Sequence, residues 1–189
     1  MDQSSVLSLF RASGALLDGH FRLSSGLHSP GYLQCALVLQ HPDRAEALGR
    51  ALAGALRDLA PTVVLSPALG GLIIGHEVGR ALGVRAIFAE RQDGVMTLRR
   101  GFTLAPADRV VVIEDVVTTG GSTRETMAVA AQAGATVVGA GAIVDRSGGA
   151  SSLDVPFRAL VALSLATHAA DQCPLCAAGT PVTKPGSRS

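Results

Sequence analysis

Apolar positions along the chain gather in short continuous runs, and segments of helical spacing lie between them. The runs are rich in Val, Ile and Leu and are bounded by Gly, Pro or charged residues, which is typical of buried strands. We expect strands at Thr62–Ser66, Arg85–Ala89, Arg109–Asp115, Thr136–Val144 and Phe157–Leu163. Apolar strands that alternate with helices predict an α/β fold in which helices cover both faces of a parallel sheet.

The segments outside these runs repeat apolar residues at helical spacing. We expect helices at Ser5–Leu16, Asp43–Leu59, Leu72–Leu82 and Ser122–Ala133. Gly83 and Gly134 directly follow the last two, as glycine commonly does at the end of a helix.

Three further segments fit neither pattern. Gly19–Cys35 is dense in Gly, Ser and Pro and predicts short strands and turns in a small lobe outside the main sheet. Glu90–Gly101 is expected to be a polar loop, and the chain from His168 an irregular, partly mobile tail. We therefore expect a single domain over residues 1–167, in which residues 19–36 form an N-terminal hood, and a separate tail over residues 168–189.

Composition narrows the functional classes. The 189 residues suffice for one domain with a full core. A net charge of +1 argues against nucleic-acid binding through a basic surface, and 3% aromatic residues without Trp leave little for base stacking. Because 48% of residues are hydrophobic and only 16% charged, self-association is expected to cover part of the apolar surface.

The sequence favours a cytoplasmic protein. Met1–Gln3 does not open a basic, apolar signal segment. The long uncharged run Thr126–Val144 contains several glycines and changes period midway, which fits a helix, a turn and a strand better than a membrane span.

The stretch VVVIEDVVTTGGST, residues 110–123, carries the most specific chemistry. Ligands of open parallel sheets bind beyond the carboxyl ends of the strands, where Glu114 and Asp115 are expected. Thr118–Ser122 then offers hydroxyls and backbone N–H groups at the start of a helix, which is a cradle for an anion. It lacks the lysine of a nucleotide-triphosphate loop and the spacing of a dinucleotide loop, so it suits a single phosphate beside a sugar diol. The alternative is an ion-paired or capping Glu114 followed by an ordinary strand–helix turn.

This stretch resembles the phosphoribosyl-pyrophosphate (PRPP) motif of type I phosphoribosyltransferases. Three other segments narrow the resemblance to the orotate phosphoribosyltransferase family: GHFRLSSGLHSPGYLQ resembles its N-terminal segment, SPALGG its pyrophosphate loop, and VDRSGG the strand end that carries an orotate-binding arginine. The resemblance covers roughly residues 5–165.

The resemblance implies an enzyme, a pentosyltransferase of pyrimidine biosynthesis. Such an enzyme transfers 5-phosphoribosyl from PRPP to orotate and releases orotidine 5′-phosphate and diphosphate. It implies Mg²⁺ as cofactor, held mainly through substrate rather than by metal-binding side chains. It further implies a cytoplasmic homodimer with a loop shared between subunits, and neither a nucleic-acid nor a membrane partner.

The resemblance also assigns residues. Asp115 and Arg91 are expected to be catalytic, and Thr118 and Arg146 to bind orotate. The set expected to bind PRPP comprises Gly70, Arg91, Glu114, Asp115, Val116, Val117, Thr118, Thr119, Gly120, Gly121 and Ser122. Two plainer alternatives stand beside these assignments: a surface Arg146 paired with Asp145, and a SPALGG turn that needs glycine for steric reasons only.

The segment Glu90–Gly101 resembles the family's mobile loop but departs from its usual residues. The family loop carries lysines and a histidine, whereas this chain has a single lysine, Lys184. Arg91-Gln92 stands where an Arg-Lys pair is usual. Ser24 stands at the position of the family's usual N-terminal lysine, and Gly70 takes the place of the usual residue near the pyrophosphate loop. The cation that stabilises leaving diphosphate must therefore come from Arg91, Arg99 or Arg100, or from elsewhere.

Two rival functions remain. A purine-type transferase would replace the carboxylate-binding arginine with aromatic stacking, which this chain is too poor in aromatics to favour. A non-catalytic PRPP sensor is favoured by the missing lysines but disfavoured by the lack of a basic nucleic-acid surface.

The tail holds Cys173 and Cys176 in a single C-x-x-C. This is half of a zinc site, for which His168 or a symmetry mate could supply the remaining ligands. A redox pair or two inert thiols in a tight turn are the alternatives, and Cys35 is expected in the core.

Overall fold

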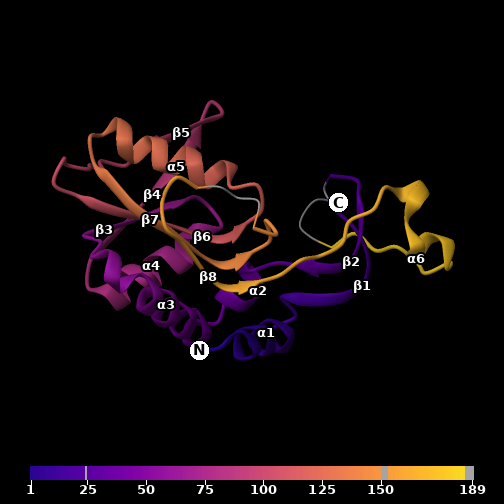
Figure 1. Cartoon of the computed structure of the whole chain (residues 1–189). Helices are drawn as coiled ribbons and strands as arrows, with labels where there is room; N and C mark the ends of the chain where they lie inside the picture. The colour runs from indigo at the N-terminus through magenta and orange to yellow at the C-terminus, as the bar shows by residue number, and fades with distance from the viewer. Residues whose placement is uncertain (24, 150–152, 186–189) are drawn as a thin grey trace.

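A six-stranded sheet forms the body of the molecule in the computed structural model, which describes residues 1–23, 25–149 and 153–185 (Figure 1). Its strand order is β5-β4-β3-β6-β7-β8. All neighbours pair in parallel except β5, which pairs antiparallel with β4 at one edge. The strands are β3 (Val63–Pro67), β4 (Arg85–Gln92), β5 (Val95–Leu98), β6 (Arg109–Val117), β7 (Thr136–Asp145) and β8 (Phe157–Ala162).

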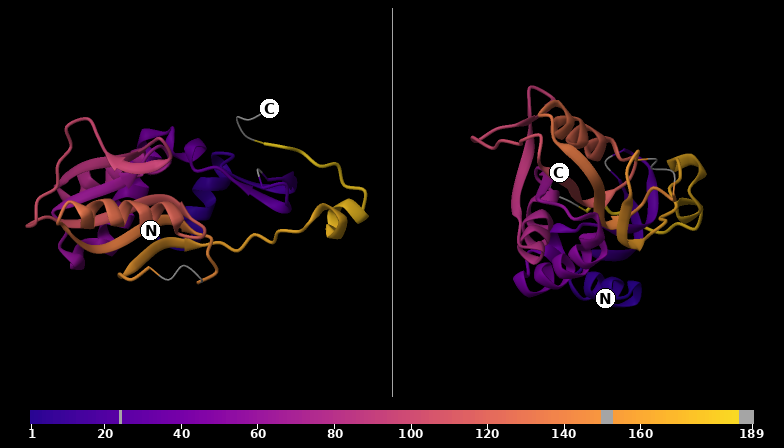
Figure 2. Two further views of the ribbon diagram at one scale, coloured as in Figure 1. Left: turned by 90° about the horizontal axis from the view of Figure 1, so that it is seen from above. Right: turned by 60° about the vertical axis from the view of Figure 1, so that its left-hand side comes forward.

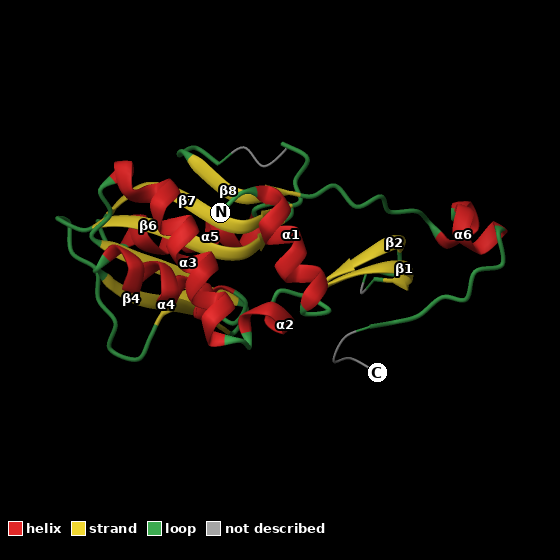
Figure 3. Cartoon of the chain, turned by 90° about the horizontal axis from the view of Figure 1, so that it is seen from below, coloured by secondary structure: helices red, strands yellow, loops and turns green. Residues whose placement is uncertain are grey.

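The apolar run of β6 faces two separate cores. Val111 and Ile113 pack on one face with helices α3 (Pro42–Leu56) and α4 (Gly71–Leu82), joined there by α1 (Gln3–Ala12) and α2 (Ala36–Leu39). Val110 and Val112 pack on the other face with α5 (Gly121–Gln132). All four β6 side chains are fully buried, because successive residues of a strand point to opposite faces. The expected sheet with helices on both faces is confirmed (Figure 3).

The helix predictions hold with shifted ends. Gly83 lies past the end of α4 at φ 74°, the left-handed conformation that favours glycine. The expected helix at Asp43–Leu59 begins at Pro42 and continues beyond Leu56 only as the 3-10 turn η1 (Arg57–Leu59). The first helix was placed too far along the chain: α1 ends at Ala12, because Gly14 turns the backbone at φ 65° and Leu16 begins strand β1.

The prediction of a polar loop at Glu90–Gly101 is wrong in its first part. Strand β4 continues to Gln92, and β5 returns beside it through a turn at Asp93 and Gly94 with φ angles of 51° and 84°. Two positive φ angles define the turn that best joins twisted antiparallel strands. Met96 of β5 is 7% exposed and belongs to the core beneath α5. This hairpin makes the sheet mixed at one edge.

The hood is a two-stranded antiparallel sheet of β1 (Leu16–Arg22) and β2 (His28–Leu33), away from the main sheet (Figures 1 and 2). The turn between them includes Ser24, which lies outside the described residues. Cys35 follows β2 and is 2% exposed, as expected for a core residue.

Residues 168–185 of the tail are mostly irregular, with the short turns η2 (Ala170–Gln172) and α6 (Pro174–Ala177), and they are held to the hood by backbone hydrogen bonds. His168 pairs with His28 on one side, and Thr183 pairs with Phe21 on the other (Figure 2). Among the helices in the described parts of the chain, none has the length and apolar character to cross a membrane.

Candidate active site

Glu114 and Asp115 form a partly buried acidic pair near the carboxyl end of β6. The Val116 N–H donates to Asp115 Oδ1 at 2.8 Å, and the Asp115 N–H donates to Glu114 Oε2 at 3.3 Å. Burial, followed by the neighbouring Asp115 charge, raises the pKa of Glu114 to about 8, and burial also raises the pKa of Asp115. Within residues 1–23, 25–149 and 153–185, neither acid has an ion-pair partner. The pair therefore suits a ligand that brings hydroxyl groups or a cation.

The turn Thr118–Gly120 and the start of α5 form a hollow beside this pair. Gly120 has φ 75°, and a Cβ there would lie 3.1 Å from Arg124 Nη1. The hollow has a volume of about 220 Å³. It is lined by Arg91, Glu114, Val116, Val117, Thr118, Thr119, Gly120, Gly121, Ser122, Thr123 and Glu125. Because α5 directs its positive end here, the hollow favours an anion.

Arg91 reaches this hollow from β4 of the same chain. Its Nη2 lies 2.5 Å from Glu125 Oε2, and its Nη1 donates to the Gly94 carbonyl at 2.7 Å. Both side chains of the ion pair are nearly half exposed, so water screens their attraction. An anionic ligand in the hollow could therefore compete with Glu125 for the guanidinium.

The turn between β3 and α4 lies against the acidic pair. A Cβ on Gly70 would come within 2.7 Å of Asp115 Oδ1, and one on Gly71 within 2.8 Å of the Ile113 carbonyl oxygen. Leu69 is 83% exposed, and the buried Ser66 Oγ has no hydrogen-bond partner among the described residues. Gly70 and Gly71 are therefore needed for steric reasons, and this role is compatible with ligand binding by their backbone N–H groups.

Arg146 follows the end of β7, and its backbone N–H donates to the Val117 carbonyl at 2.7 Å. Its Nε is buried and has no hydrogen-bond partner in the described parts of the chain, and burial lowers its pKa. The Asp145 carboxylate accepts instead from the Ser147 N–H at 2.8 Å. The alternative in which Arg146 simply pairs with Asp145 is therefore not what the structure contains.

Glu114, Asp115 and Arg146 all act electrostatically on Cys35, which lies where the hood joins the main domain. Burial raises the pKa of the Cys35 thiol most, Asp115 and Glu114 raise it further, and Arg146 lowers it. The ends of β6 and β7 and the residue after the hood thus border one region.

Arg99 and Arg100 lie apart from the hollow. Arg100 binds Glu90 through Nε at 2.9 Å and Nη2 at 3.0 Å, and Arg99 Nη1 is 3.7 Å from the same carboxylate. The structure thus brings Arg91 and Glu114 together with the turn Thr118–Ser122. It places Gly70 against Asp115 and leaves Arg99 and Arg100 outside the hollow. Sequence reasoning missed Glu125, because its partner Arg91 is 34 positions away and no local motif joins them.

The fold and the hollow at the end of β6 define a class of protein. Residues 36–162 match the model of the phosphoribosyl transferase domain, and the chain belongs to this family. The particular relatives are orotate phosphoribosyltransferases. Those of Pelotomaculum thermopropionicum and Heliobacterium modesticaldum are 53% and 55% identical to it, each over 100% of this chain and over 99% and 100% of their own lengths.

A solved structure shares the fold. It is the Mycobacterium tuberculosis H37Rv orotate phosphoribosyltransferase in complex with 5-phospho-α-D-ribosyl 1-diphosphate, which matches with a TM-score of 0.68 and 24% identity. The match covers 86% of this chain and 97% of that chain. The family resemblance seen in the sequence is confirmed.

Proposed function

We propose that this protein is an orotate phosphoribosyltransferase. In the reaction, N1 of orotate bonds to the anomeric carbon of PRPP, the bond from that carbon to diphosphate breaks, and diphosphate leaves with the electron pair while N1 loses its proton. The hollow that joins an anion-binding helix start to the partly buried Glu114, with Asp115 next to it in the strand, is the observation that carries the proposal. The relatives that match over their full lengths support it.

The hollow provides for both ends of the phosphoribosyl group. Thr118–Ser122 would hold the 5′-phosphate through backbone N–H groups and hydroxyls at the start of α5. Glu114 and Asp115 would accept hydrogen bonds from the ribose hydroxyls. Because their pKa values are raised, one proton shared between them would lower the cost of burying two carboxylates.

Arg146 and Thr118 would position orotate. A guanidinium can bind a planar carboxylate through parallel charge-assisted hydrogen bonds, and the buried, unpartnered Nε of Arg146 has capacity for such a ligand. This capacity favours orotate over a purine base, which carries no carboxylate.

The turn at Ser66–Gly71 would hold the leaving diphosphate through backbone N–H groups near Gly70. Arg91 would supply positive charge on the other side. Charge that develops as diphosphate departs is stabilised best by donors fixed in advance, and Arg91 is already held at the hollow by Glu125.

The residues present fit Mg²⁺ bound mainly through substrate. Glu114 and Asp115 are hard oxygen donors, partly buried and without a cationic partner among the described residues. Mg²⁺ prefers such oxygens together with water and phosphate oxygens. When bound, it would neutralise diphosphate charge, while the two acids would fix the ribose hydroxyls.

We also propose a cytoplasmic homodimer in which the part of Glu90–Gly101 that carries Arg99 and Arg100 completes the partner's site, while Arg91 serves its own chain. Arg99 and Arg100 are half-exposed or more and lie outside the hollow of their own chain, so they are available to a neighbour. No disulfide joins any two of the three cysteines, all of which lie in the described parts of the chain, and this suits a reducing compartment.

The direct assay follows orotate by its ultraviolet absorbance. We expect orotate loss that requires both PRPP and Mg²⁺ and releases one diphosphate per orotate. Consumption of adenine or hypoxanthine instead would support a purine transferase, and PRPP binding without turnover of any base would support a sensor.

Arg146→Ala tests the choice of base. Loss of a charged partner from a desolvated carboxylate should raise the KM for orotate by at least about thirtyfold, while the KM for PRPP changes little. Arg158→Ala on the exposed face of β8 is the matched control. Equal effects of Arg146→Ala on both substrates would contradict orotate binding by this residue.

A further inference from the structure

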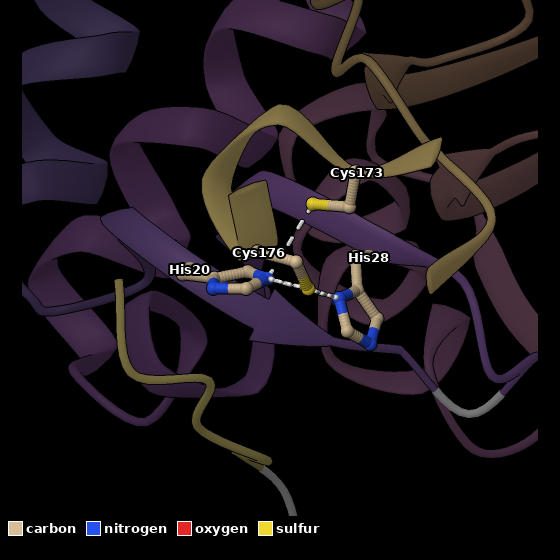
Figure 4. A group of neighbouring side chains, drawn as sticks. All are labelled: His20, His28, Cys173 and Cys176. Carbon is tan, nitrogen blue, oxygen red and sulfur yellow. Dashed lines mark hydrogen bonds between the residues drawn. The ribbon is translucent and has the colours of Figure 1, made fainter. Parts of the chain in front are cut away.

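Four side chains with metal-binding atoms meet between the hood and the tail, remote in sequence from the acidic pair. His20 comes from β1 and His28 from β2, Cys173 is the N-cap of the short helix α6, and Cys176 lies within that helix. One ligand atom of each lies within 4.8 Å of all the others. Figure 4 shows the two imidazole rings and the two sulfur atoms turned toward a common centre.

The distances among these atoms approach a tetrahedron. His20 Nε2 lies 3.5 Å from Cys173 Sγ and 3.7 Å from Cys176 Sγ, and His28 Nδ1 lies 3.2 Å from Cys176 Sγ. The two ring nitrogens are 2.9 Å apart. Zinc with bonds of about 2.0 Å to nitrogen and about 2.3 Å to sulfur separates N···S pairs by about 3.6 Å and N···N pairs by about 3.4 Å. These four pairs therefore lie within about 0.5 Å of the separations that zinc requires, and the remaining pairs lie within 4.8 Å.

The surroundings fix how His20 presents itself. Its Nδ1 lies 2.8 Å from the Thr180 carbonyl oxygen, an acceptor, so the proton belongs on Nδ1 and the lone pair of Nε2 faces the cluster. A backbone carbonyl behind the second ring nitrogen is the usual support of a metal-binding histidine. His20, His28 and Cys173 are 3%, 6% and 3% exposed, so water has little access to these ligand atoms.

We propose that His20, His28, Cys173 and Cys176 form a structural zinc site that fastens the tail to the hood. Four protein ligands leave no open position for substrate, which distinguishes a structural zinc site from a catalytic one. Binding would displace both thiol protons and leave two thiolates on the metal. The site is independent of the proposed transferase activity.

The local fold explains why a metal would stabilise the contact between the tail and the hood. Helix α6 has no buried residue. The tail contacts the hood through a few backbone hydrogen bonds, in which His168 pairs with His28 and Thr183 pairs with His20 and Arg22. Small segments that lack an apolar core commonly depend on metals or disulfides. Zinc would join residues that are 145 (His28 and Cys173) to 156 (His20 and Cys176) positions apart in the chain and so restrict the unfolded state.

Metal content of the untagged, full-length protein is the first measurement. We expect about one zinc per chain after dialysis, because a closed Cys₂His₂ site binds zinc tightly. Replacement by Co²⁺ should give the intense visible bands of tetrahedral cobalt and a sulfur-to-cobalt charge-transfer band. This spectrum tests the ligand set in the unaltered sequence, so it does not depend on whether a variant folds.

Cys176→Ser removes the exposed ligand and should abolish stoichiometric zinc and the charge-transfer band, and lower the temperature of unfolding. His168→Gln is the matched control, since this neighbouring histidine pairs with the hood only through its backbone and is outside the cluster. It should keep one zinc.

Two results would overturn the proposal. One is a wild-type protein that contains no zinc and binds no cobalt. Thiol titration and mass measurement would then show either a Cys173–Cys176 disulfide or three free thiols. The other is full zinc content in Cys176→Ser. Orotate turnover in either case would leave the proposed function standing, so the two failures are distinguishable.

Discussion

At the scale of single residues, Glu114 and Asp115 combine adjacent charges with burial. The sequence predicted their place, because a doubled acid at the end of an apolar strand has few structural uses. It could not predict their pKa values, since these depend on packing from other elements. The same holds for Arg146, whose buried, unpartnered Nε is visible only in the folded chain.

The raised pKa of Glu114 predicts how pH changes stability. Between the ordinary value of 4.5 and about 8, the folded protein binds this proton more tightly than the unfolded chain does. The contribution of Glu114 to the free energy of unfolding is therefore full at low pH and declines as pH rises through this window. Glu114→Gln has no such charge to bury, so its unfolding temperature should rise relative to wild type from about pH 5 to pH 8.

Glu46→Gln is the control, because arginine neighbours lower the pKa of this exposed acid and its titration falls below that range. Thermal unfolding at several pH values measures both variants. A difference between Glu114→Gln and wild type that stays constant with pH would show that Glu114 is ionised in the fold throughout.

At the scale of elements, continuous apolar runs located the parallel strands well, since both faces of the sheet are covered. The β4–β5 hairpin was missed because its charged residues resemble a loop, although Asp93-Gly94 is a strong hairpin signal. The end of α1 was missed because apolar residues continue past Ala12 into β1, where packing rather than periodicity decides the element.

The turn before α4 gives a prediction at this scale. Gly70 has helical φ and ψ, so alanine would fit its backbone, but the added Cβ would press on Asp115 Oδ1. Gly70→Ala should lower turnover at least about tenfold, equal to about 1.4 kcal/mol, with a smaller effect on stability.

Gly54→Ala is a matched control in α3, where an added Cβ meets nothing within 4 Å. It should keep full activity and stabilise the protein by up to about 1 kcal/mol. Steady-state kinetics and denaturant unfolding of both variants measure the two effects. Full activity in Gly70→Ala would mean that the turn does not constrain Asp115.

At the scale of the whole molecule, the sequence separated hood, body and tail but gave no sign that His20 and His28 meet the C-x-x-C. The partners are more than 140 positions apart, and the two histidines are brought together only by hairpin register. Long-range meetings of this kind need the fold, since no local pattern encodes them.

Subunit exchange tests the shared loop. An Arg99→Ala/Arg100→Ala chain and an Asp115→Asn chain should each be inactive alone. If Glu90–Gly101 completes the partner's site, random exchange should restore about a quarter of normal sites, because half of the dimers are mixed and each holds one intact site. Proven exchange without recovered activity would place the loop's action in its own chain.

The most direct test of the central claim is calorimetric titration of PRPP with Mg²⁺ into wild type and Asp115→Asn. Asp115 lies beside Glu114 and against Gly70, and asparagine has nearly the same size. Asp115→Asn should therefore unfold like wild type but bind PRPP about ten- to a hundredfold more weakly, as expected for lost hydrogen bonds to a charged group. Asp58→Asn, an exposed acid in η1 before β3, should bind like wild type. Unchanged PRPP affinity in a folded Asp115→Asn protein would contradict ribose binding by the acidic pair.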